Sequence, residues 1–398
     1  MRGLDWFTFF LADIQTGFGP FVAVYLTAQA WTQGDIGLVL TIGSLVALVG
    51  QVPAGALVDA TRFTRAIAML AVIAISASAI AIAGWPVFLV VLGSRVLHAG
   101  ASCILGPTIA ALSLGLVGHA ALGERLGRNA RFASIGGGVA AIAMGATGHF
   151  HSNQAVFIFT GILVIPAIAA LAQIRPSEIL SRSKATHRPS GSVSGIGALF
   201  GSRNLLIFAI CIVAFHLANA SMLPLMSGIL TNKTASMATT WVAACLIVPQ
   251  LVVAAFSPFI GRKAEVWGRR PWLVLCFAAL ALRGLIFAFT SDPYFVVAAQ
   301  ILDGVSAAAL AVLFPLIIAD ITRETGRFNL ALGIVGSGMG IGAALSTTVA
   351  GYTFDHVGSM GTFLGLASIA AAGLVAVVLA MPETRPCRQD AAKIEAKA

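Results

Sequence analysis

Long apolar runs separated by short charged segments restrict the fold of this sequence more than any other feature. The runs Leu251 to Ile260 and Trp272 to Phe289 flank Gly261–Pro271, a segment that contains four cations. Cations cannot remain in hydrocarbon, whereas about 20 consecutive apolar residues cross a bilayer as a helix. We therefore predict that Gly261–Pro271 is a tight cytoplasmic turn between two membrane helices.

The composition excludes a soluble protein. Of the 398 residues, 58% are hydrophobic and only 10% are charged, and the mean hydropathy is +0.95. Soluble domains contain a much larger charged fraction. The apolar runs are too long and too uniform to be strands of a membrane barrel. The predicted fold is therefore that of an all-α integral membrane protein.

Twelve membrane spans are predicted, in two groups of six. The segment between the groups is rich in Ser, Gly and basic residues, as expected of a linker. The predicted organisation is an N-terminal six-helix bundle at 1–175, a cytoplasmic linker at 176–203, a C-terminal six-helix bundle at 204–382 and a cytoplasmic tail at 383–398. The predicted spans are 6–28, 36–58, 66–84, 87–112, 132–148, 155–174, 204–229, 239–260, 271–290, 295–319, 330–352 and 361–381.

The net charge of +9 is unevenly distributed along the chain. Lys and Arg gather in alternate loops, and the other loops contain only Lys233. This asymmetry places both termini in the cytoplasm and gives no support to a nucleic-acid partner. The first span, Trp6 to Ala28, follows a short charged start and is long enough to cross a membrane, so we expect it to be retained. We expect a monomer in the lipid bilayer of a bacterial inner membrane.

An internal repeat relates the two halves. Gly55 and Asp59 in the first half correspond to Gly261 and Glu265 in the second, at equal separations close to half the chain length. Leu11-Ala12-Asp13 corresponds in the same way to Leu217-Ala218-Asn219. A chain built from two such repeats is expected to form its binding site between them.

The repeated loop resembles the signature of the major facilitator superfamily, Gly-x-x-x-Asp-x-x-Gly-Arg-Arg, which follows the second and eighth helices of that family. Here Glu265 replaces Asp in the second copy, and Arg62 stands at the later glycine of the first. The resemblance implies two pseudo-symmetric six-helix bundles and a secondary transporter. It implies no cofactor and no resident metal.

Several ionisable residues fall well inside predicted spans. A charge near the bilayer centre costs about 2.5 to 3.5 kcal/mol even on a lenient scale, so each should face a partner or a wet cavity. By resemblance, the first, fourth, seventh and tenth helices line the cavity. The substrate-cavity candidates are Asp13, Arg95, His98, His216, Asn219 and Asp303.

Proton coupling is assigned to a subset of these residues, Asp13, Asp303, Arg95 and His98. The segment from Arg95 to Gly100 resembles the superfamily's Arg-x-x-Gln-Gly motif, with His98 in place of Gln. The alternative is a buried polar network that only fixes helix register, with neutral imidazoles at His98 and His216. Arg283 is predicted to form a structural ion pair with Asp303, because the two lie at similar depth on neighbouring spans.

Charged and glycine residues at the cytoplasmic helix ends are predicted to form a gate. We expect neutralising Asp59 to have a smaller effect than neutralising Glu265, because the first copy lacks its later glycine. The alternative is a solvated loop that only anchors topology. The gate candidates are Gly55, Asp59, Arg65, Gly261, Glu265, Gly268, Arg269, Arg270, Asp320 and Arg323, with Glu324 and Arg327 beside them.

The predicted function is proton-coupled transport of a small molecule by alternating access, with export as the favoured direction. Proton symport for uptake, metal or metalloid efflux through the scattered cysteines, and a non-transporting sensor or scramblase remain alternatives. The absence of Walker, HExxH and Gly-x-Ser-x-Gly motifs disfavours a pump or an enzyme. The few charges on the cavity helices disfavour a highly charged substrate.

Overall fold

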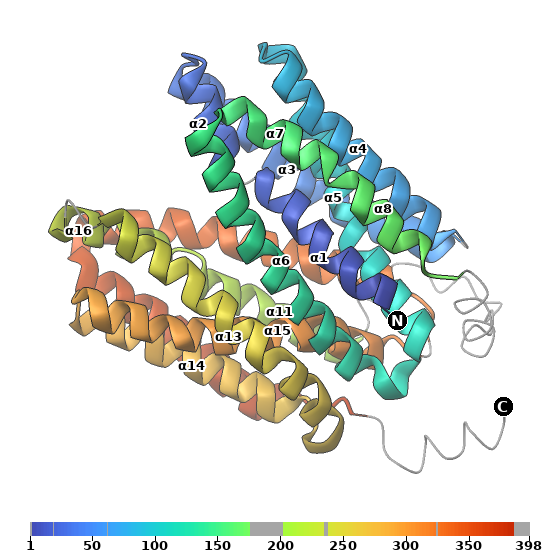
Figure 1. The fold of residues 1–398 in the computed structure, drawn as a ribbon. Helices are drawn as coiled ribbons and strands as arrows, with labels where there is room; N and C mark the ends of the chain where they lie inside the picture. Colours follow the sequence, from blue (N-terminus) through green and yellow to red (C-terminus); the bar gives the residue numbers. More distant parts are fainter. Residues whose placement is uncertain are drawn as a thin grey trace. The chain divides into compact units, whose positions relative to one another are not determined.

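The computed structural model describes residues 2–18, 20–61, 63–175, 202–234, 238–323 and 325–385. The predicted linker and tail lie mostly outside these ranges, as does Glu324. All regular elements within them are helical (Figure 1). The elements are α1 (Arg2–Gly17), α2 (Pro20–Ala28), α3 (Gln33–Ala60), α4 (Thr64–Gly84), α5 (Phe88–Val117), a 3₁₀ turn (His119–Ala121), α6 (Leu122–Phe150), α7 (Asn153–Ile162), α8 (Val164–Ala172), α11 (Arg203–Asn219), α12 (Met222–Thr234), α13 (Ala238–Trp267), α14 (Arg270–Phe289), α15 (Pro293–Ile321) and α16 (Phe328–Ala380).

These helices cover the positions of the twelve predicted spans. Nine candidate spans in the described ranges are long and apolar enough to cross a membrane, two of which each join a pair of shorter helices. The first predicted span is divided between α1 and α2, and α6 is rich in glycine and carries Glu124, Arg125 and Arg128 in its first turns. Helix α16 consists of two helices that meet at Gly358, where φ is 72°.

The charged turn that follows α13 is shorter than the sequence predicts. Gly261 to Trp267 complete α13, and α14 begins at Arg270, so only Gly268 and Arg269 lie between the two helices. Gly268 has a φ of 93°, which glycine adopts without a steric penalty. The prediction of a turn over all of Gly261–Pro271 is therefore wrong in extent. An apolar run ends where hydrocarbon ends, whereas the helix continues into the hydrated interface.

The described residues group into two compact units. The first contains the described parts of Met1–Gly118, Arg128–Arg188 and Arg327–Gly333. The second contains the described parts of His119–Gly127, Pro189–Gly326 and Ile334–Ala398. Each unit thus includes a short segment from the other half of the sequence: the start of α16 belongs to the first unit, and the start of α6 to the second.

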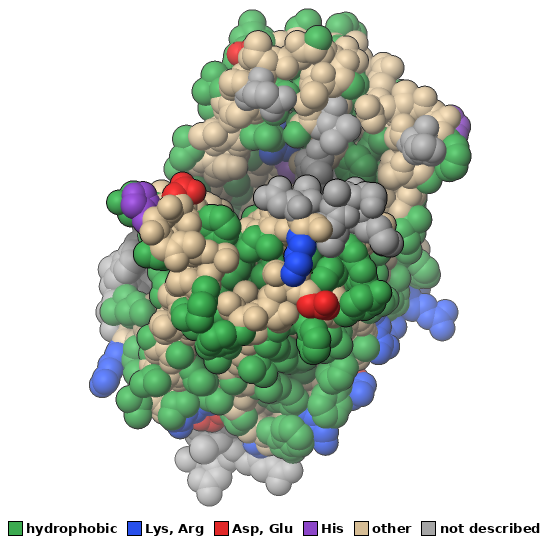
Figure 2. Space-filling model, turned by 90° about the vertical axis from the view of Figure 1, so that its left-hand side faces the viewer, with side chains coloured by type: hydrophobic (Ala, Val, Ile, Leu, Met, Phe, Trp, Pro, Cys, Tyr) green, Lys and Arg blue, Asp and Glu red, His purple; other side chains and the backbone are tan. Residues whose placement is uncertain are grey.

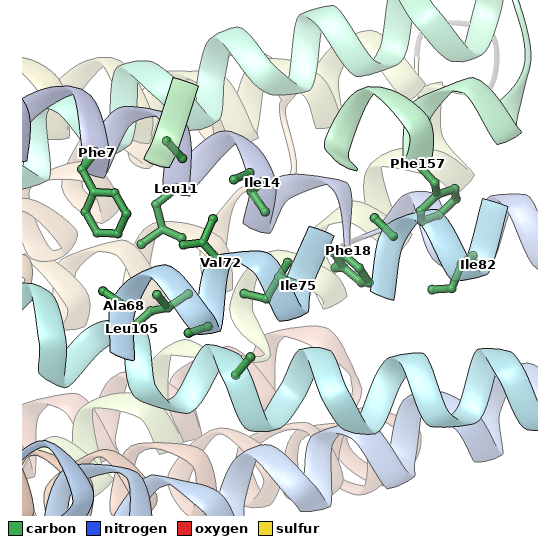
Figure 3. Packing of buried hydrophobic residues seen from close by; sticks show 14 of the residues in the cluster. Phe7, Leu11, Ile14, Phe18, Ala68, Val72, Ile75, Ile82, Leu105 and Phe157 are labelled. Atoms are coloured by element: carbon green, nitrogen blue, oxygen red, sulfur yellow. The ribbon is translucent and has the colours of Figure 1, made fainter. Parts of the chain in front are cut away.

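Buried apolar side chains of α1 to α5, α7 and α8 form a core in the first unit, part of which Figure 3 shows. Helix α1 presents one face because its core residues recur every three or four positions. Small residues allow close packing, and the Ser76 hydroxyl donates to the carbonyl of Gly161 at 2.8 Å. The labelled core residues are Phe7, Leu11 and Ile14 of α1, Phe18 directly after α1, Ala68, Val72, Ile75 and Ile82 of α4, Leu105 of α5 and Phe157 of α7.

In the second unit, α13 and α14 both pack on α15, and α11 contacts α12, α14 and α15. A hydroxyl is satisfied across the α14–α15 contact, where Ser306 donates to the carbonyl of Cys276 at 3.0 Å. The space-filling view shows hydrophobic side chains over much of the viewed face, with few charged ones (Figure 2). Large apolar side chains such as Leu89 and Leu379 are exposed, as expected of residues that face lipid.

Glycine residues of α6 allow close packing within the first unit. Gly136 lies directly against the backbone carbonyl of Phe9 on α1, so an added Cβ atom would overlap that oxygen. The same Cβ would lie 3.1 Å from Oδ1 of Asp13. Gly138, two positions further along α6, has nothing within 4 Å of the equivalent point. The contact of α1 with α6 therefore depends on one particular glycine.

We predict that Gly136→Ala lowers the thermal stability of the purified protein, because the methyl group forces α1 and α6 apart. Gly138→Ala is the matched control. It should leave stability unchanged or raise it by up to about 1 kcal/mol, since alanine is the better helix former. Thermal denaturation in detergent measures both. Equal stability of the two variants would show that the α1–α6 contact tolerates a larger residue at position 136.

Candidate functional site

A polar cluster joins α1 and α5 in the interior of the first unit. The side chain of Gln15 lies 3.1 Å from Nε2 of His98, and its amide nitrogen donates to the Ser102 hydroxyl at 3.1 Å. The His98 ring stacks on the ring of Phe18 with centroids 3.9 Å apart. Nδ1 of His98 is buried without a hydrogen-bond partner. The cluster is thus only partly satisfied.

Asp13 lies on α1 two positions before Gln15, near Gly136 of α6, and is 4% exposed. Its Oδ1 atom is buried and has no hydrogen-bond partner. Asp13 takes part in none of the ion pairs among the described residues. A carboxyl group in this position can gain or lose a proton without breaking a fixed ion pair.

Arg95 lies on α5, one turn from His98. Its Nη1 donates to the backbone carbonyl of Phe18 at 3.2 Å, and the guanidinium carbon lies 6.0 Å from the centre of the Phe18 ring. That carbonyl lies where the first span is divided between α1 and α2. The structure therefore places Asp13, Arg95 and His98 in one unit, on the two helices that the sequence assigns to the cavity.

The second unit contains a guanidinium that is paired with a carboxylate through its terminal nitrogens, although its Nε atom has no hydrogen-bond partner. Arg283 is 1% exposed and forms an ion pair with Asp303. Its Nη2 donates to Oδ1 of Asn219 at 2.5 Å, and Nη1 lies 3.5 Å from Oε1 of Gln300. The cavity candidates Asn219 and Asp303 are therefore both held by one cation. His216 stays apart from this network, with its ring against that of Phe215.

Asp59 binds the first turn of α16 within the first unit. Its carboxylate accepts hydrogen bonds from the backbone N–H of Asn329 at 3.1 Å, from the Asn329 amide at 2.8 Å and from the backbone N–H of Leu330 at 2.8 Å. Gly55, one turn earlier on α3, lies against the carbonyl of Asn329 and leaves no room for a side chain. The N–H groups of a first helical turn have no partners in their own helix, so Asp59 caps α16.

Glu265 has the corresponding role in the second unit. Its Oε1 accepts the backbone N–H of Gly123 in the first turn of α6 at 3.0 Å, and Gly261 packs directly on Gly123. Its Oε2 lies 3.1 Å from Nη1 of Arg269, and Nε of Arg269 donates to Asp320 at 2.9 Å. Both copies of the repeated loop therefore use a glycine and a carboxylate to hold the start of another helix.

Three other predicted gate residues are arginines: Arg65 and Arg270 donate hydrogen bonds to backbone carbonyls, and Arg323 adds to burial in lowering the pKa of a nearby histidine. Arg65 donates to the carbonyl of Ile174 at 2.9 Å, and Arg270 donates to the carbonyl of Val378. Arg323 acts on His119, which precedes α6: burial, together with the Arg323 charge, lowers the pKa of His119 to about 4. His119 is therefore neutral at physiological pH and adds no charge to the start of α6.

Sequence reasoning missed several contacting residues. Gln15, Ser102 and Gln300 are neutral, so their burial in a span gives no strong signal from composition. Glu383 accepts the backbone N–H groups of Arg269 at 2.8 Å and Arg270 at 3.1 Å, and so caps α14. Its position directly after the last apolar run was the available sign of that role.

Comparison with known proteins identifies the family to which this architecture corresponds. The sequence profile of the Major Facilitator Superfamily matches residues 6–248 and 208–397. An uncharacterized MFS-type transporter of Mycobacterium tuberculosis (strain CDC 1551 / Oshkosh) is 37% identical over 393 residues, which cover 96% of this chain and 93% of the relative. An efflux pump of Dothistroma septosporum is 31% identical over 122 residues, covering 30% of this chain and 20% of the pump. The crystal structure of the Escherichia coli fucose:proton symporter has the same fold, with a TM-score of 0.74 at 16% identity over 94% of this chain and 97% of that one.

The long apolar helices and the match to this family define a polytopic membrane transporter and not an enzyme. The chain belongs to the major facilitator superfamily. Its fold is the all-α fold of that family, with two six-helix bundles, and it carries small-molecule substrates across the membrane in which it is embedded.

The Arg283–Asp303 contact generates a test of stability. We expect Arg283→Met to destabilise the protein by about 3 to 5 kcal/mol, because it leaves a carboxylate in the bundle without its counter-charge. The double variant Arg283→Met with Asp303→Asn should recover much of that loss. Reversible unfolding of the single and double variants measures the coupling between the two residues. Strictly additive losses would show that the ion pair contributes no coupling.

Proposed function

We propose that this transporter exchanges a small organic molecule for protons and that Asp13 carries the coupling proton. The observation that supports this role is the buried, unpartnered Oδ1 atom of Asp13. Asp303, the other carboxylate well inside a span, is neutralised by Arg283. Proton exchange at Asp303 would require breaking that ion pair, whereas exchange at Asp13 would not.

Export is the direction that we propose. The relative from Dothistroma septosporum is named as an efflux pump, and its similarity to this chain supports export without extending to the substrate. The positive-inside distribution of Lys and Arg supports cytoplasmic termini in a bacterial inner membrane. We further propose that the protein works as a monomer, with the two six-helix halves at 1–175 and 204–382 joined by the linker at 176–203.

The carboxylate caps at the starts of α6 and α16 form the proposed cytoplasmic gate. Opening would require the first turn of α16 to leave Asp59 and the first turn of α6 to leave Glu265. Arg269 and Asp320 fix the position of Glu265, while Gly55 and Gly261 allow the close approach. Because these contacts would exist only in the closed state, they would bias the equilibrium between states by their own free energy.

Everted membrane vesicles with an acidic interior test the proposed coupling. A compound that enters in exchange for protons releases the pH gradient, which a pH-sensitive dye reports, and a library screened in this way identifies substrates. We predict that Asp13→Asn lowers this substrate-dependent proton release at least tenfold. Asp35→Asn is the matched control, because Asp35 is an exposed carboxylate bonded to Thr32 at the start of its own helix.

Full proton release in Asp13→Asn vesicles would refute the role of Asp13. Failure of every compound to release the gradient, combined with uptake driven by an inward gradient in right-side-out vesicles, would favour a symporter over an exporter. Each of these outcomes identifies the part of the proposal that fails.

Hydrogen–deuterium exchange tests the gate. Losing a charge-assisted hydrogen bond, worth about 1.5 to 3 kcal/mol, should raise the open population roughly tenfold or more. We predict that Asp59→Asn speeds amide exchange in residues 327–333 and, because opening is concerted, in residues 119–127 as well. The three hydrogen bonds of Asp59 now predict a larger effect than that of Glu265→Gln, the reverse of the order expected from the sequence. Faster exchange confined to the segment that each carboxylate caps would contradict a concerted gate.

A further inference from the structure

The first unit contains a guanidinium whose charge no carboxylate balances. Arg95 has one hydrogen bond, from Nη1 to the carbonyl of Phe18, and its Nε atom is buried without a partner. It takes part in none of the ion pairs among the described residues. Intramembrane cations normally pair with an anion, so this side chain has unused binding capacity.

Arg283 shows how the same chain treats a guanidinium that has only a structural role. Nε is unpartnered in both arginines, but the terminal nitrogens of Arg283 are held by Asp303, Asn219 and Gln300, a carboxylate and two amides. Arg95 has instead a backbone carbonyl and the face of one aromatic ring. Capping the Phe18 carbonyl uses Nη1 alone, so a structural role at the break in the first span leaves the rest of the guanidinium free.

The free edge of Arg95 faces a glycine. A Cβ atom on Gly43 of α3 would lie 3.4 Å from Nε and 3.5 Å from Nη2 of Arg95. These two nitrogens form the edge through which arginine binds a carboxylate with two parallel hydrogen bonds. A side chain at position 43 would therefore lie against the edge with the geometry for anion binding, and glycine leaves that edge in contact with no side chain of α3 at this position.

The surroundings of this edge fit an organic anion better than an inorganic one. The buried, stacked rings of Phe18 and His98 give the guanidinium an apolar neighbour, with its carbon 6.0 Å from the centre of the Phe18 ring. Gln15 and Ser102 lie around His98, and the unpartnered Nδ1 of His98 provides a further polar contact. A molecule with one carboxylate and a small apolar body matches these groups.

We propose that the Nε–Nη2 edge of Arg95 binds the carboxylate of a small organic monoanion, and that this carboxylate belongs to the transported substrate. The proposal rests on the transport function proposed above and specifies its substrate class. One negative charge fits a single unpaired guanidinium, in agreement with the small number of charges on the cavity helices.

Calorimetry on the purified full chain at constant ionic strength tests the site, with benzoate as the probe and benzyl alcohol and benzylamine as neutral and cationic analogues. Benzoate should bind at least about tenfold more tightly than either analogue. Arg95→Gln should abolish that preference, and Arg95→Lys should weaken it because lysine lacks the two-donor edge.

Gly43→Ala is the second variant, because its methyl group would occupy the free edge while the helix is stabilised and the charge is unchanged. It should weaken benzoate binding at least tenfold. Gly37→Ala on the same helix, with nothing within 4 Å of its added Cβ, and Lys233→Gln, which removes an exposed cation, are matched controls. Both should bind benzoate within twofold of the unaltered protein.

Equal binding of benzoate and benzyl alcohol to the unaltered protein would overturn the proposal, as would retained benzoate affinity in both Arg95→Gln and Gly43→Ala. Tighter binding of benzylamine than of benzoate would overturn it in favour of a cation site at Asp13. The result is separate from the vesicle experiment, because Asp13→Asn should lose proton release and keep benzoate binding, whereas Gly43→Ala should lose benzoate binding.

Discussion

The N–H groups in the first turn of a helix have no acceptor within that helix, and in this protein carboxylates from other helices or from the chain end supply one. Asp59 accepts from the start of α16, Glu265 from the start of α6 and Glu383 from the start of α14. Each contact combines a negative charge with the positive end of a helix. The glycines that stand four positions before Asp59 and Glu265 allow the backbones to approach closely enough for the bond to form.

A second constraint acts deeper in the bundles, where a charged side chain costs free energy unless it pairs with an opposite charge or faces water. Arg283 and Asp303 neutralise one another, and the amides of Asn219 and Gln300 accept further hydrogen bonds from the cation. Asp13 and Arg95 are not satisfied in this way, although both are surrounded by protein. The two units thus contain similar residue types in different electrostatic states, which supports assigning stability to one cluster and transport to the other.

The spans and the repeat could be predicted because they depend on local properties, namely the length of apolar runs and the equal spacing of Gly55, Asp59, Gly261 and Glu265. The partner of Asp59 could not, because Asn329 lies 270 positions away and its selection depends on tertiary arrangement. The cavity prediction selected Arg95 and His98 because of their cost in hydrocarbon. It missed Gln15 and Ser102, since neutral polar residues in a span have little such cost. The extent of the charged turn was wrong because hydropathy marks the edge of the membrane and not the end of a helix.

The assignment of Arg327–Gly333 to the first compact unit has a consequence for biogenesis. A ribosome synthesises Asp59 long before Asn329 and Leu330, so the N-terminal half inserts into the membrane with this carboxylate still hydrated. The N–H group of Gly123 likewise has no Glu265 acceptor until the second half has been synthesised. The first unit is therefore completed only when the start of α16 has been synthesised. A truncated chain released before that point would present Asp59 without its hydrogen-bond donors to the quality-control machinery of the cell.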